Sequence, residues 1–215
     1  MSLSKVIEIA RAELGVYESP PGSNRVKYWA DYDPAYQGQP WCVSFLWWVF
    51  QQAGERMAFF GGGKTASCSM LLRWYKEQGL TVAKKDIQIG DIVILNFSGT
   101  QDTQHCGLVV DKGKLAGTWY TVEGNTTPGE EGSQDDGGCV ALKMRSIRNV
   151  VGVCRPQYQP EPVTVDDISG HWAEESVRWC LEHGLLKGYP DGSFGPDKPV
   201  TRAELATVLR RLVEK

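Results

Sequence analysis

Pro40-Trp41-Cys42-Val43-Ser44-Phe45-Leu46-Trp47-Trp48-Val49-Phe50 sets a proline and a cysteine directly before a long apolar run. Proline suits the first turn of a helix, because its φ is fixed and its missing N–H is not needed there. A helix that is apolar all round is buried, so we expect one over about 42–53 in the centre of a domain. Cys42 would then lie at the positive end of a buried helix dipole. That position favours thiolate over thiol and makes a cysteine nucleophilic.

The composition limits the class of protein. The 215 residues are enough for one full core and a small second domain. A formal net charge of −3 gives no electrostatic reason to expect nucleic acid or an anionic membrane as a partner. The first eleven residues resemble an amphipathic helix rather than a secretion signal. We therefore expect a protein made in the cytoplasm that reaches its target by a non-Sec route.

The order of the predicted elements indicates the fold class. Helical patterns come first, over 3–14, 26–30, 42–53 and 67–78, and strand patterns follow, over 90–97, 107–110, 118–123 and 150–154. Helices followed by a run of strands are typical of α+β folds with an antiparallel sheet. We expect helices packed on that sheet.

The composition changes near residue 157. The stretch Pro156-Gln-Tyr-Gln-Pro160-Glu-Pro162 is stiff and rich in proline. We therefore expect a first domain over 1–157, a linker over 158–164 and a small all-α domain over 165–215. About 50 residues is marginal for a self-standing core, so the second domain should dock on the first or on copies of itself.

A base and an orienting group are needed to activate Cys42, because a free thiol is only a few per cent thiolate at neutral pH. His105 is the one histidine of the predicted first domain. Glu123 and Asn125 alternate with a glycine, so both side chains should leave the same strand face and either could orient His105. If each residue is considered without the others, His105 is best interpreted as a core histidine and Glu123 as a surface carboxylate. The order Cys, His, Glu/Asn favours a cysteine hydrolase.

Five segments of the predicted first domain resemble CHAP domains, the cysteine- and histidine-dependent amidohydrolase/peptidase modules of peptidoglycan hydrolases, related to papain-like folds. They are Asn24-Arg-Val-Lys-Tyr28, Pro40-Trp41-Cys42, Gly90-Asp91-Ile92-Val93, His105-x-Gly107-Leu-Val and Glu123-Gly124-Asn125. The resemblance implies that Cys42 is the nucleophile, His105 the general base and acid, Glu123 the orienting carboxylate and Asn125 its support. Helix-start N–H groups would supply part of the oxyanion site, and the side chain that completes it stays open among Gln37, Tyr36 and Tyr28.

Metal and thiol chemistry receives little support from the sequence. Some CHAP domains bind calcium before the cysteine, and Asp31 and Asp33 form an alternating acidic pair there. The remaining ligands do not follow that pattern, and a solvated turn is the alternative we favour, so no cofactor is expected. The other cysteines lack the spacing of a zinc site or a disulfide framework. We interpret Cys68, Cys106, Cys154 and Cys180 as small buried hydrophobic residues.

The tail resembles one S-layer homology (SLH) repeat. The matching segments are Asp167-Ile168-x-Gly-His-Trp172-Ala173, Glu182-x-Gly184-Leu-Leu-x-Gly188-Tyr-Pro-Asp-Gly-x-Phe194-x-Pro196 and Thr201-Arg202-Ala-Glu204. The resemblance implies an anchor for secondary cell-wall polysaccharide, with Trp172 and Arg202 as candidate sugar contacts. Core packing is the alternative for Trp172, and a solvated helix start for Arg202. Such repeats usually act in threes, so one copy suggests a homotrimer through the tail.

The sequence therefore predicts a peptidoglycan hydrolase targeted to the Gram-positive cell wall. The substrate would be the stem peptide, cleaved by an N-acetylmuramoyl-L-alanine amidase or an endopeptidase activity. A phage-type endolysin with holin-type release is the expected setting. Two alternatives remain: a catalytically dead wall-binding or scaffolding protein, and a papain-like protease that acts on proteins.

Overall fold

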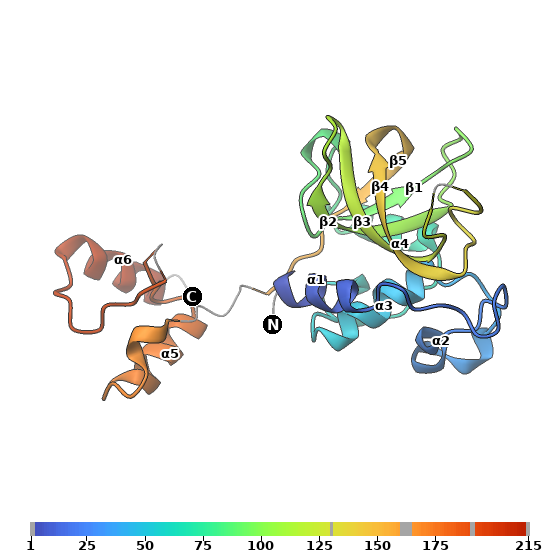
Figure 1. Ribbon diagram of the computed structural model, residues 1–215. Coiled ribbons are helices and arrows are strands. Elements are labelled where there is room, and N and C mark those ends of the chain that lie inside the picture. The colour runs from blue at the N-terminus through green and yellow to red at the C-terminus, as the bar shows by residue number, and fades with distance from the viewer. Residues whose placement is uncertain (1–2, 130, 160–164, 190–191, 214–215) are drawn as a thin grey trace. The chain divides into compact units, whose positions relative to one another are not determined.

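The computed structural model describes residues 3–129, 131–159, 165–189 and 192–213. The chain divides into two compact units, Met1–Pro160 and Glu161–Lys215, which are described separately below (Figure 1). Most of the predicted linker, residues 160–164, lies outside the described residues. Among the described helices, none is long and apolar enough to cross a membrane.

The first unit has the predicted α+β architecture. Its helices come first: α1 (Leu3–Ala12), α2 (Lys27–Tyr32), α3 (Cys42–Gln52) and α4 (Cys68–Glu77). The strands follow: β1 (Ile92–Leu95), β2 (His105–Lys112), β3 (Thr118–Thr126), β4 (Cys139–Ser146) and β5 (Val150–Cys154). Within the described residues these strands form one antiparallel sheet in the order β4-β3-β2-β1-β5. The first unit is therefore an α+β domain with an antiparallel sheet, as predicted.

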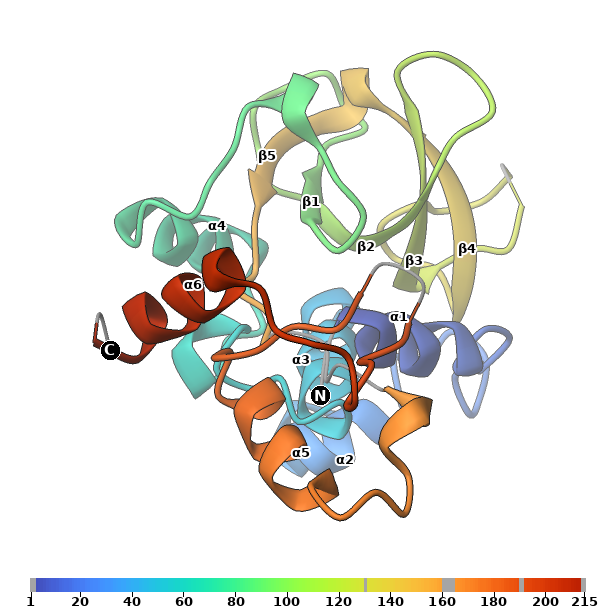
Figure 2. The same cartoon turned by 90° about the vertical axis from the view of Figure 1, so that its left-hand side faces the viewer.

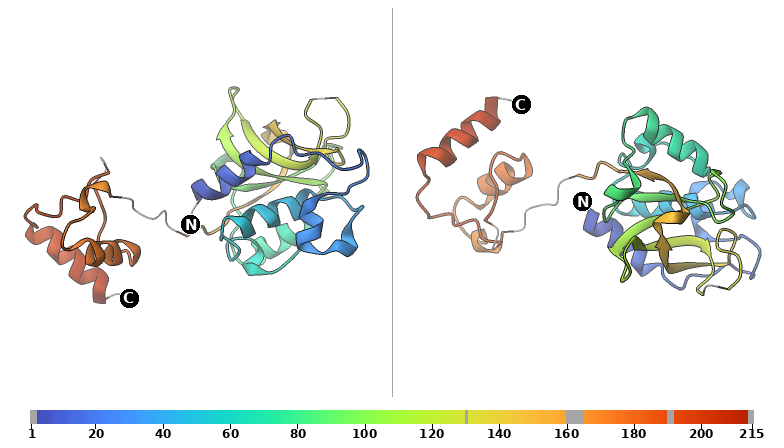
Figure 3. Two further views of the ribbon diagram at one scale, coloured as in Figure 1. Left: turned by 60° about the horizontal axis from the view of Figure 1, so that its bottom comes forward. Right: turned by 90° about the horizontal axis from the view of Figure 1, so that it is seen from above.

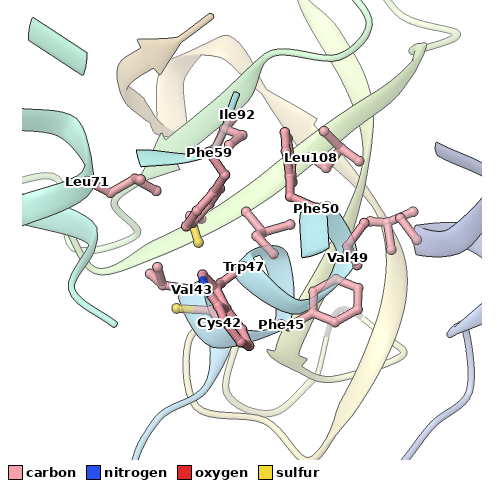
Figure 4. Packing of buried hydrophobic residues seen from close by; sticks show 14 of the residues in the cluster. Cys42, Val43, Phe45, Trp47, Val49, Phe50, Phe59, Leu71, Ile92 and Leu108 are labelled. Carbon is pink, nitrogen blue, oxygen red and sulfur yellow. The ribbon is translucent and has the colours of Figure 1, made fainter. Parts of the chain in front are cut away.

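Helix α3 is the centre of this unit, as its apolar sequence predicts. It packs on β2 and β3 and also contacts α1 and α2. These three helices lie together on one side of the sheet, and α4 lies at the β5 end (Figures 2 and 3). The α3 side chains Val43, Phe45, Val49 and Phe50 are fully buried among those of the sheet and of α4 (Figure 4). Burial of this apolar run fixes where the first residue of α3 lies.

The sequence-based prediction misses strand β4, because this strand buries charged side chains and exposes apolar ones. Lys143 and Arg145 point inward and are only 2% and 6% exposed, whereas Leu142 and Met144 are about 40% and 39% exposed. The Lys143 ammonium donates to the Thr127 and Gly129 carbonyl groups. A pattern search expects apolar residues on the buried face of a strand, so it passes over this one.

Strand β3 approaches the start of α3 very closely at Gly124. A Cβ atom at this position would lie 2.7 Å from Phe45 Cβ and 2.7 Å from Trp41 Cζ3. Only glycine fits there without a shift of the helix. Glu123 is thereby held next to the element that carries Cys42.

The second unit is helical, as predicted, with α5 (Glu174–Glu182) and α6 (Arg202–Val213) as its longer elements. Its small core consists of Val165, Ile168, Val177 and Leu181. Thr201 and Glu204 cap α6 reciprocally: the Thr201 N–H donates to Glu204 Oε2 at 2.8 Å, and the Glu204 N–H donates to Thr201 Oγ1 at 3.2 Å. No described residue of α6 is buried, so this helix adds little to the core.

Candidate active site

Cys42 is the first residue of α3 and is 5% exposed. Figure 4 shows its side chain at the beginning of the helix, beside the buried apolar residues. The first N–H groups of a helix have no partner within that helix, and they favour a negative charge nearby. The buried apolar face of α3 therefore positions a thiol where a thiolate is stabilised.

His105 is the first residue of β2 and is fully buried. Its Nε2 atom lies 3.1 Å from Glu123 Oε2 on the neighbouring strand. Its Nδ1 atom is buried and has no hydrogen-bond partner among the described residues. A carboxylate on Nε2 fixes the tautomer and the direction of the ring, so Nδ1 is the nitrogen available to Cys42.

Glu123 is fully buried and is held by Arg145 of β4, a residue that the sequence did not suggest. Arg145 Nε donates to Glu123 Oε1 at 2.8 Å, and Nη2 donates to Oε2 at 2.5 Å. Thr121 Oγ1 donates to Oε1 at 2.6 Å. Burial raises the pKa of Glu123, but hydrogen bonds and charge from Arg145 and His105 outweigh it and lower that pKa to about 2. The carboxylate is therefore ionised at any pH near neutrality.

Cys42 and His105 stabilise each other's charged forms. Burial would lower the pKa of His105, but its interactions with Cys42 and Glu123 raise the pKa to about 9. Hydrogen bonding from the Cys106 and Cys68 thiols lowers the pKa of Cys42 well below 9.0 against the effect of burial, and His105 lowers that pKa further. The pair therefore favours thiolate and imidazolium at neutral pH, the state in which a cysteine attacks a carbonyl carbon.

Asn125 does not join this network in the way that simple strand alternation predicts. Its φ is +60°, and the pairing of β3 with β4 shifts register between Glu123 and Thr126. Its Nδ2 atom donates to the Asp135 carbonyl at 3.2 Å and to Asp136 Oδ1 at 3.4 Å. The bulge breaks the period of two, and the Asn125 amide bonds to the loop before β4 instead of to His105.

The three oxyanion candidates differ in their contacts. The Gln37 amide bonds to the backbone of Val26 through both of its ends, at 3.1 and 2.9 Å. The Tyr28 hydroxyl is buried and donates to Glu13 Oε2 at 2.7 Å. Tyr36 is 45% exposed and stacks on Trp29. Gln37 and Tyr28 are thus bonded within the fold, whereas Tyr36 is open to a bound molecule.

A cavity of about 520 Å³ lies among segments that precede Cys42 and Cys68 in the chain. Its lining is largely aromatic, with one lysine, and comes from the segments before Cys42 and before Cys68: Trp29, Tyr32, Tyr36, Gln39, Pro40, Lys64, Thr65, Ala66, Ser67 and Met70. Pro40 is two residues before Cys42, and Ser67 directly precedes Cys68. The cavity is therefore the candidate substrate site closest in the chain to Cys42, although the thiol itself does not line it.

The calcium candidates Asp31 and Asp33 each accept a hydrogen bond within the fold. Asp31 Oδ2 accepts from Trp48 Nε1 at 2.6 Å, and Asp33 Oδ1 accepts from the Ala35 N–H at 3.0 Å. Among the described residues, Asp31 and Asp33 belong to no group of three or more possible metal ligands.

The second unit presents both of its candidate sugar contacts to solvent. Trp172 is 91% exposed, which excludes the core-packing alternative within this unit. Arg202 is exposed at the first position of α6. A cavity of about 560 Å³ lies between the start of α6 and the segments 186–189 and 194–200, and neither Trp172 nor Arg202 lines it.

Comparison with known protein families agrees with this geometry. The family model described as "CHAP domain" matches residues 34–125, and the model described as "S-layer homology domain" matches residues 166–206. The chain contains a CHAP domain followed by an SLH domain. A CHAP domain implies a cysteine-dependent amidase or peptidase, and an SLH domain indicates a location at the cell surface or cell wall.

The relatives found among curated proteins share a short part of the chain. The cellulosome-anchoring protein of Acetivibrio thermocellus is 46% identical over 54 residues, which cover 25% of this chain and 12% of that protein. The S-layer protein of Bacillus licheniformis is 33% identical over 64 residues, which cover 30% of this chain and 7% of that protein. The chain therefore matches only a small part of each of these relatives.

Among solved structures, the crystal structure of the wild type endolysin LysIME-EF1 resembles this one weakly. The TM-score is 0.44 at 16% sequence identity, over 74% of this chain and 66% of that chain.

Replacement of Arg145 by methionine should destabilise the CHAP domain, because it leaves the buried Glu123 carboxylate without its cation. We expect the free energy of unfolding to fall by about 3–5 kcal/mol at neutral pH. The pKa of Glu123 is depressed in the folded protein, so its stabilisation is present above about pH 4.5 and is lost as the pH falls toward about 2. The difference in the free energy of unfolding between wild type and Arg145→Met, measured by urea titration, should therefore decrease as the pH falls from about 4.5 to about 2.

The exposed Arg148 provides the matched control. Arg148→Met should change the free energy of unfolding by less than about 0.5 kcal/mol. If the difference in the free energy of unfolding between wild type and Arg145→Met stayed constant down to about pH 2, Arg145 would not be the partner of a charged Glu123.

Proposed function

We propose that the chain is a cysteine-dependent peptidoglycan hydrolase that its SLH domain anchors to the Gram-positive cell wall. The observation that carries the proposal is the buried group formed by Cys42 at the start of α3 and by His105, whose ring is held by Glu123. The scissile bond would be an amide of the stem peptide. Both an N-acetylmuramoyl-L-alanine amidase and an endopeptidase fit these groups.

The proposed reaction has two steps. The Cys42 thiolate attacks the amide carbonyl carbon, and the His105 imidazolium donates its Nδ1 proton to the leaving nitrogen, so that a thioester forms and an amine departs. His105, now neutral, takes a proton from water, and the hydroxide attacks the thioester. The carboxylate product leaves, and the thiolate and the imidazolium are restored. Glu123 keeps its negative charge throughout and holds the ring in place.

Negative charge develops on the substrate's carbonyl oxygen when Cys42 attacks. The N–H groups at the start of α3 would stabilise that charge, because Cys42 is the first residue of this helix. Tyr36 is the side chain that we propose as a further donor, since its ring lines the cavity. Asn125 would act indirectly, by holding the loop before β4 against the end of β3.

The proposed setting is a phage-type endolysin, because one chain combines a hydrolase domain with a wall anchor. Such an enzyme would be made in the cytoplasm and released through a holin-type pore.

Cys42→Ala should abolish lysis of purified Gram-positive walls and leave wall binding unchanged, because it removes the nucleophile and does not touch the SLH domain. Turbidity loss and mass spectrometry of the released fragments measure activity, and co-sedimentation measures binding. Cys180→Ala, in the second unit, is the control and should lyse like wild type. Full activity of Cys42→Ala would refute the assignment. Hydrolysis of casein with no action on walls would favour a protein-cleaving protease instead.

Trp172 and Arg202 are the residues that we propose to contact the wall polysaccharide, because both are exposed and both match the SLH pattern. Tryptophan and arginine are the side chains that most often dominate binding surfaces. Each substitution by alanine should weaken binding to purified walls about tenfold, or about 1.4 kcal/mol. Trp179→Ala is the matched control, since Trp179 is 51% exposed in the same unit. If all three variants lost the same affinity for purified walls, Trp172 and Arg202 would not form a specific polysaccharide site.

We also propose that the chain forms a homotrimer through α6. Leu205, Leu209 and Leu212 follow each other along the helix and are 48%, 53% and 57% exposed. Such an apolar stripe is typical of a helix that packs against another copy.

Light scattering on the intact chain should give three times the 23.9 kDa chain mass. Leu209→Glu should reduce the mass to that of the monomer, because it places a charge in the apolar stripe. Leu115→Glu, at a leucine that is 63% exposed in the first unit, should leave the trimer intact. A monomeric wild-type chain would show the trimer proposal to be wrong.

A further inference from the structure

Three buried thiols lie close together in the first unit. The Sγ atoms of Cys42, Cys68 and Cys106 all lie within 4.8 Å of one another, and those of Cys42 and Cys68 are 3.8 Å apart. The three residues come from the first position of α3, the first position of α4 and the second position of β2. All three are free thiols and are 5%, 7% and 0% exposed. The proposed hydrolysis uses only Cys42.

We propose that Cys42, Cys68 and Cys106 together form a binding site for one soft divalent metal ion such as Zn²⁺, which blocks the nucleophile when it is bound. The binding itself follows from the three thiols. The blocking effect rests on the proposed function of Cys42.

The spacing of the sulfur atoms fits a tetrahedral ion. A Zn–S bond is about 2.3 Å long, so two thiolates on one tetrahedral zinc ion are about 3.8 Å apart. The Cys42–Cys68 distance already has this value. The third sulfur lies within 4.8 Å of the others, so it needs to move by no more than about 1 Å to complete the face of a tetrahedron.

A fourth donor lies next to Cys42. His105 Nδ1 is buried without a hydrogen-bond partner among the described residues, and its other nitrogen bonds to Glu123. A histidine that ligates zinc typically bonds to a carboxylate through its second nitrogen. Three cysteines and one histidine are a common ligand set for zinc. His105 is not among the side chains whose ligand atoms all lie within 4.8 Å of one another, so its binding to the ion would require a movement of the ring.

The charges of the site are compatible with a cation. Zn²⁺ with three thiolates carries a net charge of −1, which is less buried charge than three thiolates without an ion, and the Glu123–Arg145 ion pair is neutral overall. A thiol, or a histidine nitrogen that carries a proton, must lose that proton before it can bind a metal ion, so affinity should rise with pH.

The ion has a route to the thiols. Cys42 and Cys68 each keep a few per cent of exposed surface, and their neighbours Pro40 and Ser67 line the cavity. A metal ion on the Cys42 sulfur would in any case occupy the nucleophile and exclude its attack on a substrate.

The test is a titration of the intact, reduced chain with Cd²⁺ without substrate, followed by the ultraviolet thiolate-to-cadmium charge-transfer band. We expect saturation at one ion per chain, displacement by Zn²⁺ and an affinity that rises with pH. Cys68→Ser and Cys106→Val should each weaken binding by at least about 100-fold, since outer-shell changes alone cost 10–100-fold. Cys154→Ala removes a thiol that is equally buried but lies outside the cluster, and it should bind like wild type.

A second measurement uses the unmodified chain. Zn²⁺ should protect Cys42, Cys68 and Cys106 from alkylation, as read by mass spectrometry, and leave Cys180 reactive. No saturable binding, or equal affinity in Cys68→Ser, Cys106→Val and wild type, would overturn the site. If Cd²⁺ binds at one per chain but Zn²⁺ does not inhibit wall lysis by an active enzyme, the site stands and the blocking effect is refuted. If the chain never lyses walls, the proposed function fails while the metal site is retained.

Discussion

One buried carboxylate, Glu123, is the point on which the CHAP domain depends. It sits on β3 and binds His105 of β2 on one side and Arg145 of β4 on the other. An isolated charge in that position would be very costly, so the partners are required by the physics of burial as much as by any reaction. The same contacts that make the charge tolerable also join the three strands and aim the imidazole. Stability and chemistry therefore share one set of hydrogen bonds.

The sequence predicts those parts of the site that carry a local signal. Cys42 follows a proline and precedes an apolar helix, and His105 and Glu123 lie on recognisable strands. Arg145 could not be found in this way, because β4 directs its basic residues inward and its Leu142 and Met144 outward. Asn125 was expected on the face of Glu123, and a bulge with a positive φ sends its amide elsewhere. Alternation predicts side-chain direction only where the ladder is regular.

The thiol cluster illustrates a different limit. Cys68 and Cys106 were expected to be small buried hydrophobic residues, and both are buried, as is Cys154, whereas Cys180 is half-buried. Nothing in their spacing says that they meet at Cys42, since 26 residues separate Cys42 from Cys68 in the chain. Only the packing of α3, α4 and β2 brings them together. Contacts between distant segments are set by the tertiary fold, and a residue's immediate neighbours do not reveal them.

The inverted polarity of β4 also bears on aggregation. β4 is at one end of the sheet order, where an unpaired strand can recruit another chain. Residues 15–18 already pair with the beginning of β4, so only the rest of the strand is an open edge. Charged side chains on the inward face of an edge strand are one known protection against pairing with another chain. A flat apolar edge pairs readily, whereas buried lysine and arginine side chains need specific partners. Lys143 and Arg145 meet that description. Arg145, which binds the buried Glu123 carboxylate, therefore also disfavours pairing at this edge of the sheet. We expect a variant without Arg145 to be more prone to form intermolecular β-structure.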